Sequence, residues 1–307
     1  MRFALRTVLV SGALLTSIGM VAAQQAGKPG AKEAAPAPAA ATAGTTCAGN
    51  PNALGVSRTV EIDTTGAPGF GFDHYKAHDF LQPKEVVLTF DDGPQVKTTH
   101  AILEALAAHC VKATFFSVGK MALGLPEIIR DVAKGGHTIG THTWSHLDVS
   151  KLSQEKGLEE IERGISAVKR AVGGPIAPFF RYPALKDTPH TLQHLAARNV
   201  AIFSTDIDSF DFKFRDAAGL VKSVMSKLEK RGKGILLMHD IQPGTAKAVP
   251  ELLRELKAQG YKIVHMKPRG ELATLADYDK LVEKDVKGLP AAGSEKPTSS
   301  VVRTISN

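Results

Sequence analysis

The sequence lacks the features that mark several large classes of protein. Its 307 residues include only two cysteines, contain no internal repeat, and have no long apolar run beyond the first twenty positions. This composition excludes a fibrous protein and a multi-span membrane protein. The hydrophobic content of 43% is instead sufficient for a sizeable core in one ordinary domain or two small ones.

A strong charge of one sign is also absent. The formal charge of +7 falls to +5 once two arginines, Arg2 and Arg6, are removed with an expected leader. This is a weak bias toward anionic partners. The basic residues are scattered beside glutamates along amphipathic segments rather than gathered in one stripe, so we expect no nucleic-acid binding.

The two cysteines, Cys47 and Cys110, fit an oxidising compartment. A zinc site built on them is disfavoured because no close Cys or His pair accompanies either residue. A single disulfide and two unpaired thiols remain as alternatives, between which the sequence does not decide.

The first residues resemble a secretory signal. Arg2 and Arg6 precede an apolar run over residues 7–20, and Val21-Ala22-Ala23 offers a cleavage site. An uncleaved anchor is the alternative, disfavoured because the run is short and contains Ser and Gly. We expect a periplasmic or secreted monomer with no membrane contact after cleavage.

Shifts in composition predict five segments. They are a signal peptide (1–23), an Ala/Pro-rich disordered linker (24–46), a loop-rich extension (47–84), a main domain (85–275) and a C-terminal tail (276–307). The extension has a possible strand at Val60–Ile62, and the sequence leaves open whether it covers the main domain or hangs free.

The main domain alternates short β-rich segments with amphipathic helical ones. The expected strands are Val86–Phe90, Ala113–Val118, Thr138–Thr141, Phe179–Tyr182, Ala201–Thr205, Ile235–Met238 and Lys262–His265. The expected helices are Thr98–His109, Pro126–Lys134, Gln154–Val172, Pro189–Arg198, Ala217–Arg231 and Thr245–Gln259. This order predicts an α/β fold with parallel strands. We favour a barrel over a doubly wound sheet because polar residues follow several different strands.

Two clusters suggest a metal site. Asp91 and Asp92 directly follow the first apolar strand, where adjacent carboxylates need a cation or a positive side chain nearby; a plain Asp-Gly turn is the alternative. His142 and His146 are four residues apart, a spacing that would point both rings the same way on one helical turn. Two imidazoles and one carboxylate leave coordination positions open, as in a catalytic metal site. His137 is interpreted as structural.

Three further clusters follow three further strands. Arg181 ends one strand, and if buried its guanidinium needs a carboxylate, which either Asp91 or Asp211 could supply. The next strand is followed by three carboxylates, Asp206, Asp208 and Asp211. His239 ends another apolar strand. One such histidine would usually be a core residue, but five polar clusters at five strand ends favour a shared site.

The series TFDDGP, HTWSH, RYPA, DSFDF and LMH, in this order between Glu85 and Met266, resembles the motifs of the NodB-homology polysaccharide deacetylases, carbohydrate esterase family 4. The resemblance implies a distorted seven-stranded (β/α) barrel. It also implies a divalent metal, zinc with cobalt or manganese as alternatives, bound by Asp92, His142 and His146.

By the same resemblance, Asp91 would be the general base and His239 the general acid. Arg181 would orient Asp91, and Asp211 would orient His239. The substrate-binding positions implied by the family are Ala184, through its backbone N–H, Tyr182, Phe212 and Leu237. The sequence departs from the family where Ala184 and Leu185 replace an aromatic residue and glycine, and where Phe212 replaces tryptophan. These changes alter the walls of the expected sugar groove.

The expected function is hydrolysis of acetamido groups on a polysaccharide containing N-acetylglucosamine, such as a chitin-like oligosaccharide, peptidoglycan or poly-N-acetylglucosamine. Two alternatives remain open: an O-acetyl esterase acting on acetylated xylan, and a carbohydrate-binding wall protein without turnover. Retention of an acid, a base and a metal set together argues against the binding protein.

Overall fold

A computed structural model describes Cys47 and residues 49–287, all within one folded unit. The expected leader, the whole of the expected linker and residues 288–307 lie outside the described residues. The strands are β1 (Arg58–Ile62), β2 (Gly69–Phe70), β3 (Glu85–Asp91), β4 (Thr114–Ser117), β5 (Thr138–Thr141), β6 (Phe179–Phe180), β7 (Ala201–Phe203), β8 (Ile207–Asp208), β9 (Gly234–His239) and β10 (Lys262–Pro268).

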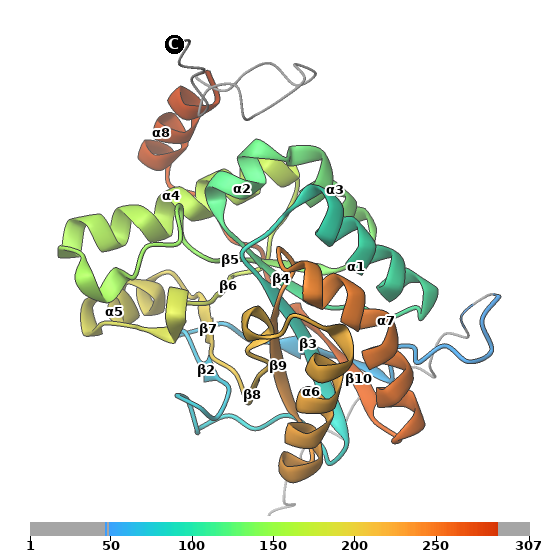
Figure 1. The fold of residues 1–307 in the computed structure, drawn as a ribbon. Helices are drawn as coiled ribbons and strands as arrows, with labels where there is room; N and C mark the ends of the chain where they lie inside the picture. The colour runs from blue at the N-terminus through green and yellow to red at the C-terminus, as the bar shows by residue number, and fades with distance from the viewer. Residues whose placement is uncertain (1–46, 48, 288–307) are drawn as a thin grey trace, which may run out of the picture. The chain divides into compact units, whose positions relative to one another are not determined.

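Helices fill the intervals between the strands (Figure 1). They are α1 (Val96–Ala108), α2 (Gly119–Gly124), α3 (Pro126–Lys134), α4 (Gln154–Val172), α5 (Pro189–Ala197), α6 (Ala217–Arg231), α7 (Pro243–Ala258) and α8 (Ala276–Lys287). Three short 3₁₀ helices are η1 (Val149–Lys151), η2 (Pro183–Leu185) and η3 (Asp211–Lys213). None of the helices in the described part of the chain is both long and apolar enough to span a membrane.

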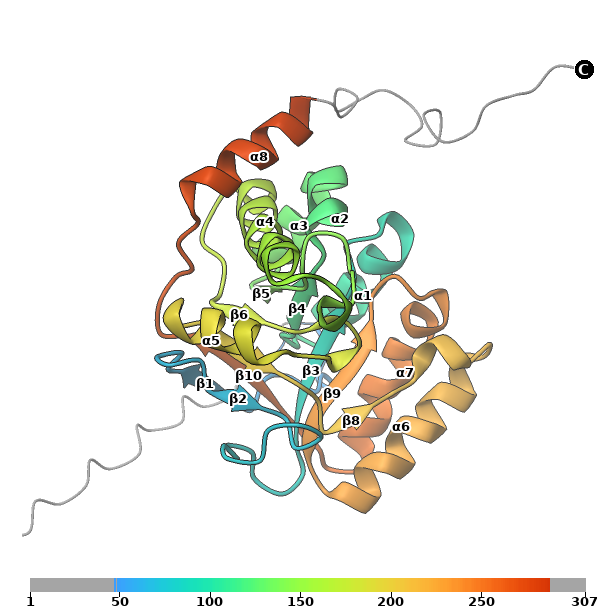
Figure 2. The ribbon, with the colours of Figure 1, turned by 90° about the vertical axis from the view of Figure 1, so that its left-hand side faces the viewer.

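All strand pairs are parallel, and the sheet curls into a distorted barrel (Figure 2). Strand β3 is part of the barrel wall. Strand β3 pairs with β9 along one edge, and with β10 and then β4 along the other. The order continues from β4 through β5, β6 and β7 to β2, while β8 lies beside β9. The expected α/β barrel is therefore confirmed: its seven strands are β3 to β7, β9 and β10, and three short strands are added.

Alternation of side chains along the strands separates the barrel interior from its outer surface. In β3, Val87 packs with interior residues such as Phe179 and Phe203, whereas Leu88 and Phe90 pack against the surrounding helices. Because strand side chains alternate, Asp91 points to the same side as Val87. Burial on both faces explains why β3 reads as a continuous apolar run.

The N-terminal extension is part of the barrel. Strand β1, foreseen at Val60–Ile62, pairs with β10, and β2 pairs with β7. Ile62, Phe70 and Leu81 are buried in the interior cluster. The extension therefore covers the main domain, the arrangement that the sequence left open.

The helices follow the expected pattern, with two additions. Helix α4 begins where the Ser153 side chain accepts a hydrogen bond from the Lys156 N–H, and ends at Gly173 with a φ of 69°. The six-residue α2 is too short for a periodic signal. The first part of the expected C-terminal tail forms α8 and packs on the domain. Val282 is fully buried, and Arg163 of α4 pairs with Asp285 at 2.7 Å.

The two cysteines form a disulfide. Cys47 and Cys110 are 63 positions apart, and their Cα atoms are separated by 5.6 Å. The bond joins the start of the described chain to Cys110, two residues after the end of α1. The alternative of two unpaired thiols is therefore wrong.

Replacing both cysteines with serine should lower the free energy of unfolding by about 2–4 kcal/mol, because a loop of this length restricts the unfolded chain. Urea denaturation of Cys47→Ser/Cys110→Ser, followed by circular dichroism, measures the change. Reduction of the wild type should reproduce it. Equal denaturation midpoints for the variant and the oxidised wild type would contradict the prediction.

Candidate active site

Five strand ends bring polar side chains together at the carboxyl end of the barrel. Asp91, the last residue of β3, is in register with His239, the last residue of β9. His142 directly follows β5, and Arg181 directly follows β6. Because parallel strands point the same way, groups far apart in sequence meet at one mouth.

The guanidinium of Arg181 is fully buried, and each of its three nitrogens donates a hydrogen bond. Its Nη1 donates to Asp91 Oδ1 and Thr89 Oγ1, each at 2.7 Å. Its Nη2 donates to the Ser204 carbonyl at 2.8 Å and its Nε to the Phe203 carbonyl at 3.2 Å. Of the two partners considered from the sequence, Asp91 is the one that pairs with Arg181. The pairing fixes one carboxylate oxygen of Asp91 and places a positive charge beside it.

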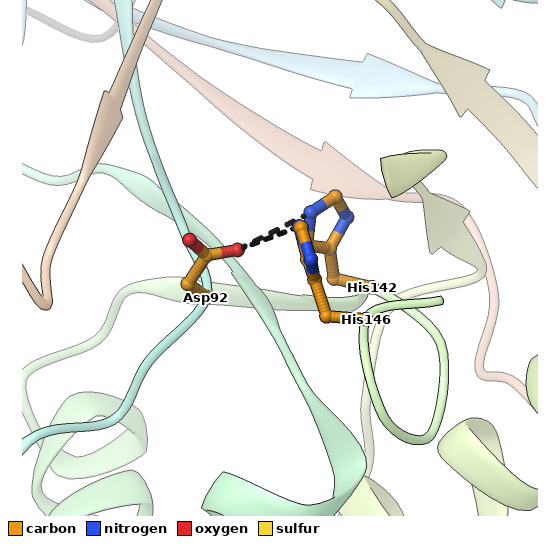
Figure 3. A group of neighbouring side chains, drawn as sticks. All are labelled: Asp92, His142 and His146. Carbon is orange, nitrogen blue, oxygen red and sulfur yellow. Dashed lines mark ion pairs between the residues drawn. The ribbon is translucent and has the colours of Figure 1, made fainter. Parts of the chain in front are cut away.

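Asp92, His142 and His146 converge on one point (Figure 3). Their potential ligand atoms all lie within 4.8 Å of one another. The Nε2 atoms of His142 and His146 are 3.4 and 3.2 Å from Asp92 Oδ1. The His142 ring is buried, whereas the His146 side chain is 46% exposed. The group is thus open to solvent on one side, as a catalytic rather than a closed structural metal site would be.

The hydrogen bonding of this triad fits a cation. His142 Nδ1 lies 2.7 Å from the Arg181 carbonyl oxygen, which can only accept, so Nδ1 carries the proton. Burial lowers the pKa of His142, which favours the neutral ring with an Nε2 lone pair facing Asp92. Asp92 Oδ1 is buried without a hydrogen-bond partner among the described residues. Facing lone pairs repel, and a divalent cation between them would remove the repulsion.

The segment from His142 to His146 is not a helical turn. It follows β5 as an irregular loop in which Thr143 and His146 have φ values of 65° and 62°. The His146 N–H donates to Thr143 Oγ1 at 3.0 Å. The helical geometry expected from the four-residue spacing is therefore wrong, although both rings do reach the same point.

His239 and Asp211 form a second coupled pair. His239 Nδ1 lies 2.7 Å from Asp211 Oδ1, and Asp211 Oδ2 accepts from the His239 N–H at 2.7 Å and from Thr245 Oγ1 at 2.5 Å. Burial alone would lower the pKa of His239, but the hydrogen bond and negative charge of Asp211 outweigh it and raise the pKa to about 9. The imidazole can therefore hold a proton at neutral pH.

The expected substrate-binding residues separate into two groups. Ala184 is exposed with a φ of 52°, Phe212 is 54% exposed with its ring centroid 5.9 Å from that of His239, and Leu237 is buried next to the end of β9. The Tyr182 side chain, by contrast, is 2% exposed and its hydroxyl donates to Thr191 in the core. The Tyr182 ring therefore packs in the helix-facing core, and the substrate contact implied for Tyr182 stays a prediction.

Asp240 was not foreseen from the sequence. It follows His239, accepts from Thr99 Oγ1 at 2.6 Å and is fully buried beneath Gly93, where an added Cβ would lie 2.0 Å from Asp240 Oδ2. Burial, reinforced by the charge of Asp92, raises the pKa of Asp240 to about 7. The His-Asp dipeptide at a strand end was the signal from which Asp240 could have been predicted.

His137, in contrast, is structural. Its Nδ1 accepts from the Ala113 N–H, and burial lowers its pKa to about 3.

Comparison with known proteins agrees with this geometry. A family model described as polysaccharide deacetylase matches residues 80–202. The peptidoglycan-N-acetylglucosamine deacetylase PgdA of Listeria monocytogenes is 32% identical over 59% of this chain, and the match covers 38% of PgdA. The chain thus spans well under half of that relative's length.

For two further relatives, the match covers a larger share of the relative's length than it does for PgdA. A peptidoglycan-N-acetylglucosamine deacetylase of Bacillus cereus is 32% identical over 59% of this chain and 85% of its own length. The solved structure of the peptidoglycan deacetylase Bd3279 of Bdellovibrio bacteriovorus aligns with a TM-score of 0.63 and 32% identity, covering 69% of this chain and 59% of that one. This chain belongs to the polysaccharide deacetylase family.

Proposed function

We propose that this chain is a metal-dependent deacetylase that hydrolyses the acetamido groups of a polysaccharide containing N-acetylglucosamine. One observation carries the proposal: a carboxylate held by Arg181 and an imidazole held by Asp211 lie at the ends of paired strands, beside three side chains that could hold a metal ion. A proton acceptor and a proton donor beside a cation site are what amide hydrolysis requires.

The metal ligands in this proposal are Asp92, His142 and His146. A divalent cation, for which we propose zinc, would polarise the acetyl carbonyl and lower the pKa of an attacking water. Cobalt and manganese are alternatives because the donors are two imidazoles and one carboxylate.

Asp91 would act as the general base. Its Oδ1 is held by Arg181 Nη1, which leaves the other carboxylate oxygen to take a proton from the attacking water. Arg181 fixes the direction of this carboxylate. The proton acceptor is therefore already oriented before the substrate arrives.

His239 would act as the general acid. An amide nitrogen is a poor leaving group until it is protonated, and the pKa of about 9 keeps the imidazole protonated at neutral pH. Asp211 accepts from His239 Nδ1, so the proton delivered to the departing amine comes from Nε2.

Substrate contacts would come from the loops around the mouth. The exposed backbone of Ala184 would donate its N–H to the developing oxyanion, while Leu237 and Phe212 would contact the acetyl methyl and the sugar. The names of several relatives support peptidoglycan as the substrate, and a relative named for chitooligosaccharides supports the chitin-like alternative. The disulfide supports action outside the cytoplasm.

Replacing Asp91 with Asn should lower kcat/KM for acetate release from N-acetylglucosamine oligomers by about 10²–10⁴-fold, because the proton acceptor is lost. Zinc content should stay unchanged, since Asp91 is not a proposed ligand. Asp63→Asn, on an exposed turn, is the matched control. Removal of the metal with a chelator should abolish release, and added zinc should restore it.

Two outcomes of the same assay would replace the proposal. Acetate released from acetylated xylan alone would favour the O-acetyl esterase. Bound zinc without release from any acetylated glycan would favour a carbohydrate-binding protein.

Replacing Asp211 with Asn should lower the pKa of His239 from about 9 toward the ordinary value near 6.5. NMR titration of the imidazole in metal-free protein measures the shift. In the active enzyme, His239 would then lose its proton at a lower pH than in the wild type. The alkaline limb of the pH profile of kcat/KM should therefore move toward neutrality. Asp208→Asn, whose Oδ1 accepts from the Phe210 N–H, is the control. An unchanged titration in Asp211→Asn would refute the coupling.

A further inference from the structure

The loop that carries both histidine ligands has an unfavourable backbone. Thr143 and His146 both lie in the left-handed region, with φ values of 65° and 62°. Residues with a β-branched or bulky side chain rarely adopt this conformation unless their surroundings impose it. The position of His146 therefore depends on what holds the loop from outside.

Helix α4 supplies that hold through Glu160. Its carboxylate accepts from the Ser145 N–H at 2.8 Å and from Ser145 Oγ at 2.7 Å, one donor on each oxygen. The backbone carbonyl of Glu160 accepts from the Trp144 N–H at 2.7 Å. One residue of α4 thus binds the two residues that immediately precede His146.

Close packing surrounds these hydrogen bonds. A Cβ added at Gly164, one turn farther along α4, would lie 2.4 Å from the Thr143 carbonyl carbon. On the other side, the N–H groups of Gly119 and Lys120 at the start of α2 donate to the carbonyls of Thr143 and Trp144, each at 2.9 Å. The loop is therefore enclosed between α2 and α4.

The carboxylate of Glu160 is unusual because it is buried and has no cationic partner among the described residues. The residue is only 8% exposed, and among the residues that the structure describes it makes no ion pair. A buried carboxylate without a cationic partner is normally unfavourable, whereas its neighbour Glu162 pairs with Arg198 and His194. A charged acceptor forms stronger hydrogen bonds than a neutral one, which suits a loop that must be held.

We propose that Glu160 is a positioning residue for the metal site, and that it sets the affinity for a divalent cation by fixing Ser145 and thereby His146. It touches neither the cation nor the substrate. The inference rests on the proposed metal site but adds a residue outside the ligand set, 14 positions beyond His146 in the sequence.

The test is the dissociation constant for Zn²⁺, measured on metal-free protein by competition with a chromogenic chelator. Glu160→Ala should weaken binding by about 10–100-fold, the usual effect of losing a partner that orients a ligand. Glu160→Gln keeps one acceptor and should weaken binding less. Glu159→Ala, which removes a partly buried ion pair with Arg163 on the same helix, should leave the affinity unchanged.

A double-mutant cycle separates positioning from general stability. Ser145→Ala should weaken Zn²⁺ binding, but should add little in the Glu160→Ala background if both act through one contact. Circular dichroism and thermal melting of each metal-free variant identify those that remain folded. If Glu160→Ala does not fold, Glu160→Gln and Ser145→Ala carry the same test.

A folded Glu160→Ala that binds Zn²⁺ as tightly as Glu159→Ala would overturn the proposal, as would additive losses in the cycle. The measurement uses no substrate, so it is separate from the test of deacetylation. A wild type that binds Zn²⁺ with the expected loss in Glu160→Ala, yet releases no acetate, would support this inference while refuting the proposed activity.

Discussion

The ion pair between Arg181 and Asp91 organises the mouth of the barrel. A fully buried guanidinium is tolerated only when its charge and its N–H groups are all matched, so its partners cannot move independently. Asp91 of β3 provides the charge, Thr89 accepts one further hydrogen bond, and carbonyls at and just beyond the end of β7 accept two more. The Arg181 carbonyl in turn accepts from His142 Nδ1. A single residue therefore orients both the proposed base and one proposed ligand.

Left-handed backbone is concentrated on the loops above these strand ends. Asp92, Thr143, His146, Ala184 and Phe210 all have positive φ values. Each such residue costs on the order of 1–3 kcal/mol, which must be offset by contacts elsewhere. Here the contacts come from the barrel interior and from helices α2 and α4. The stable core thus supports a mouth whose loops would not adopt these conformations alone.

The N-terminal extension is part of the same sheet as the strands that carry the site. The family model matches from residue 80, yet β1 and β2 precede that point and pair with β10 and β7. The Tyr75 hydroxyl also donates to Asp187 at 2.6 Å, which joins the extension to the loop that carries Ala184. Part of the wall around the proposed substrate site therefore comes from outside the matched segment.

The sequence by itself determined the parallel β/α order, the seven main strands and the residues at their ends, because apolar runs and helical periodicity are local signals. It also indicated Asp92, His142 and His146 by residue type and order. Only the tertiary structure decided that Arg181 pairs with Asp91, that Tyr182 faces the core, that Cys47 bonds Cys110, and that Glu160 and Asp240 lie against the site. These depend on which distant segments become neighbours, and on loop conformations that packing imposes against local preference.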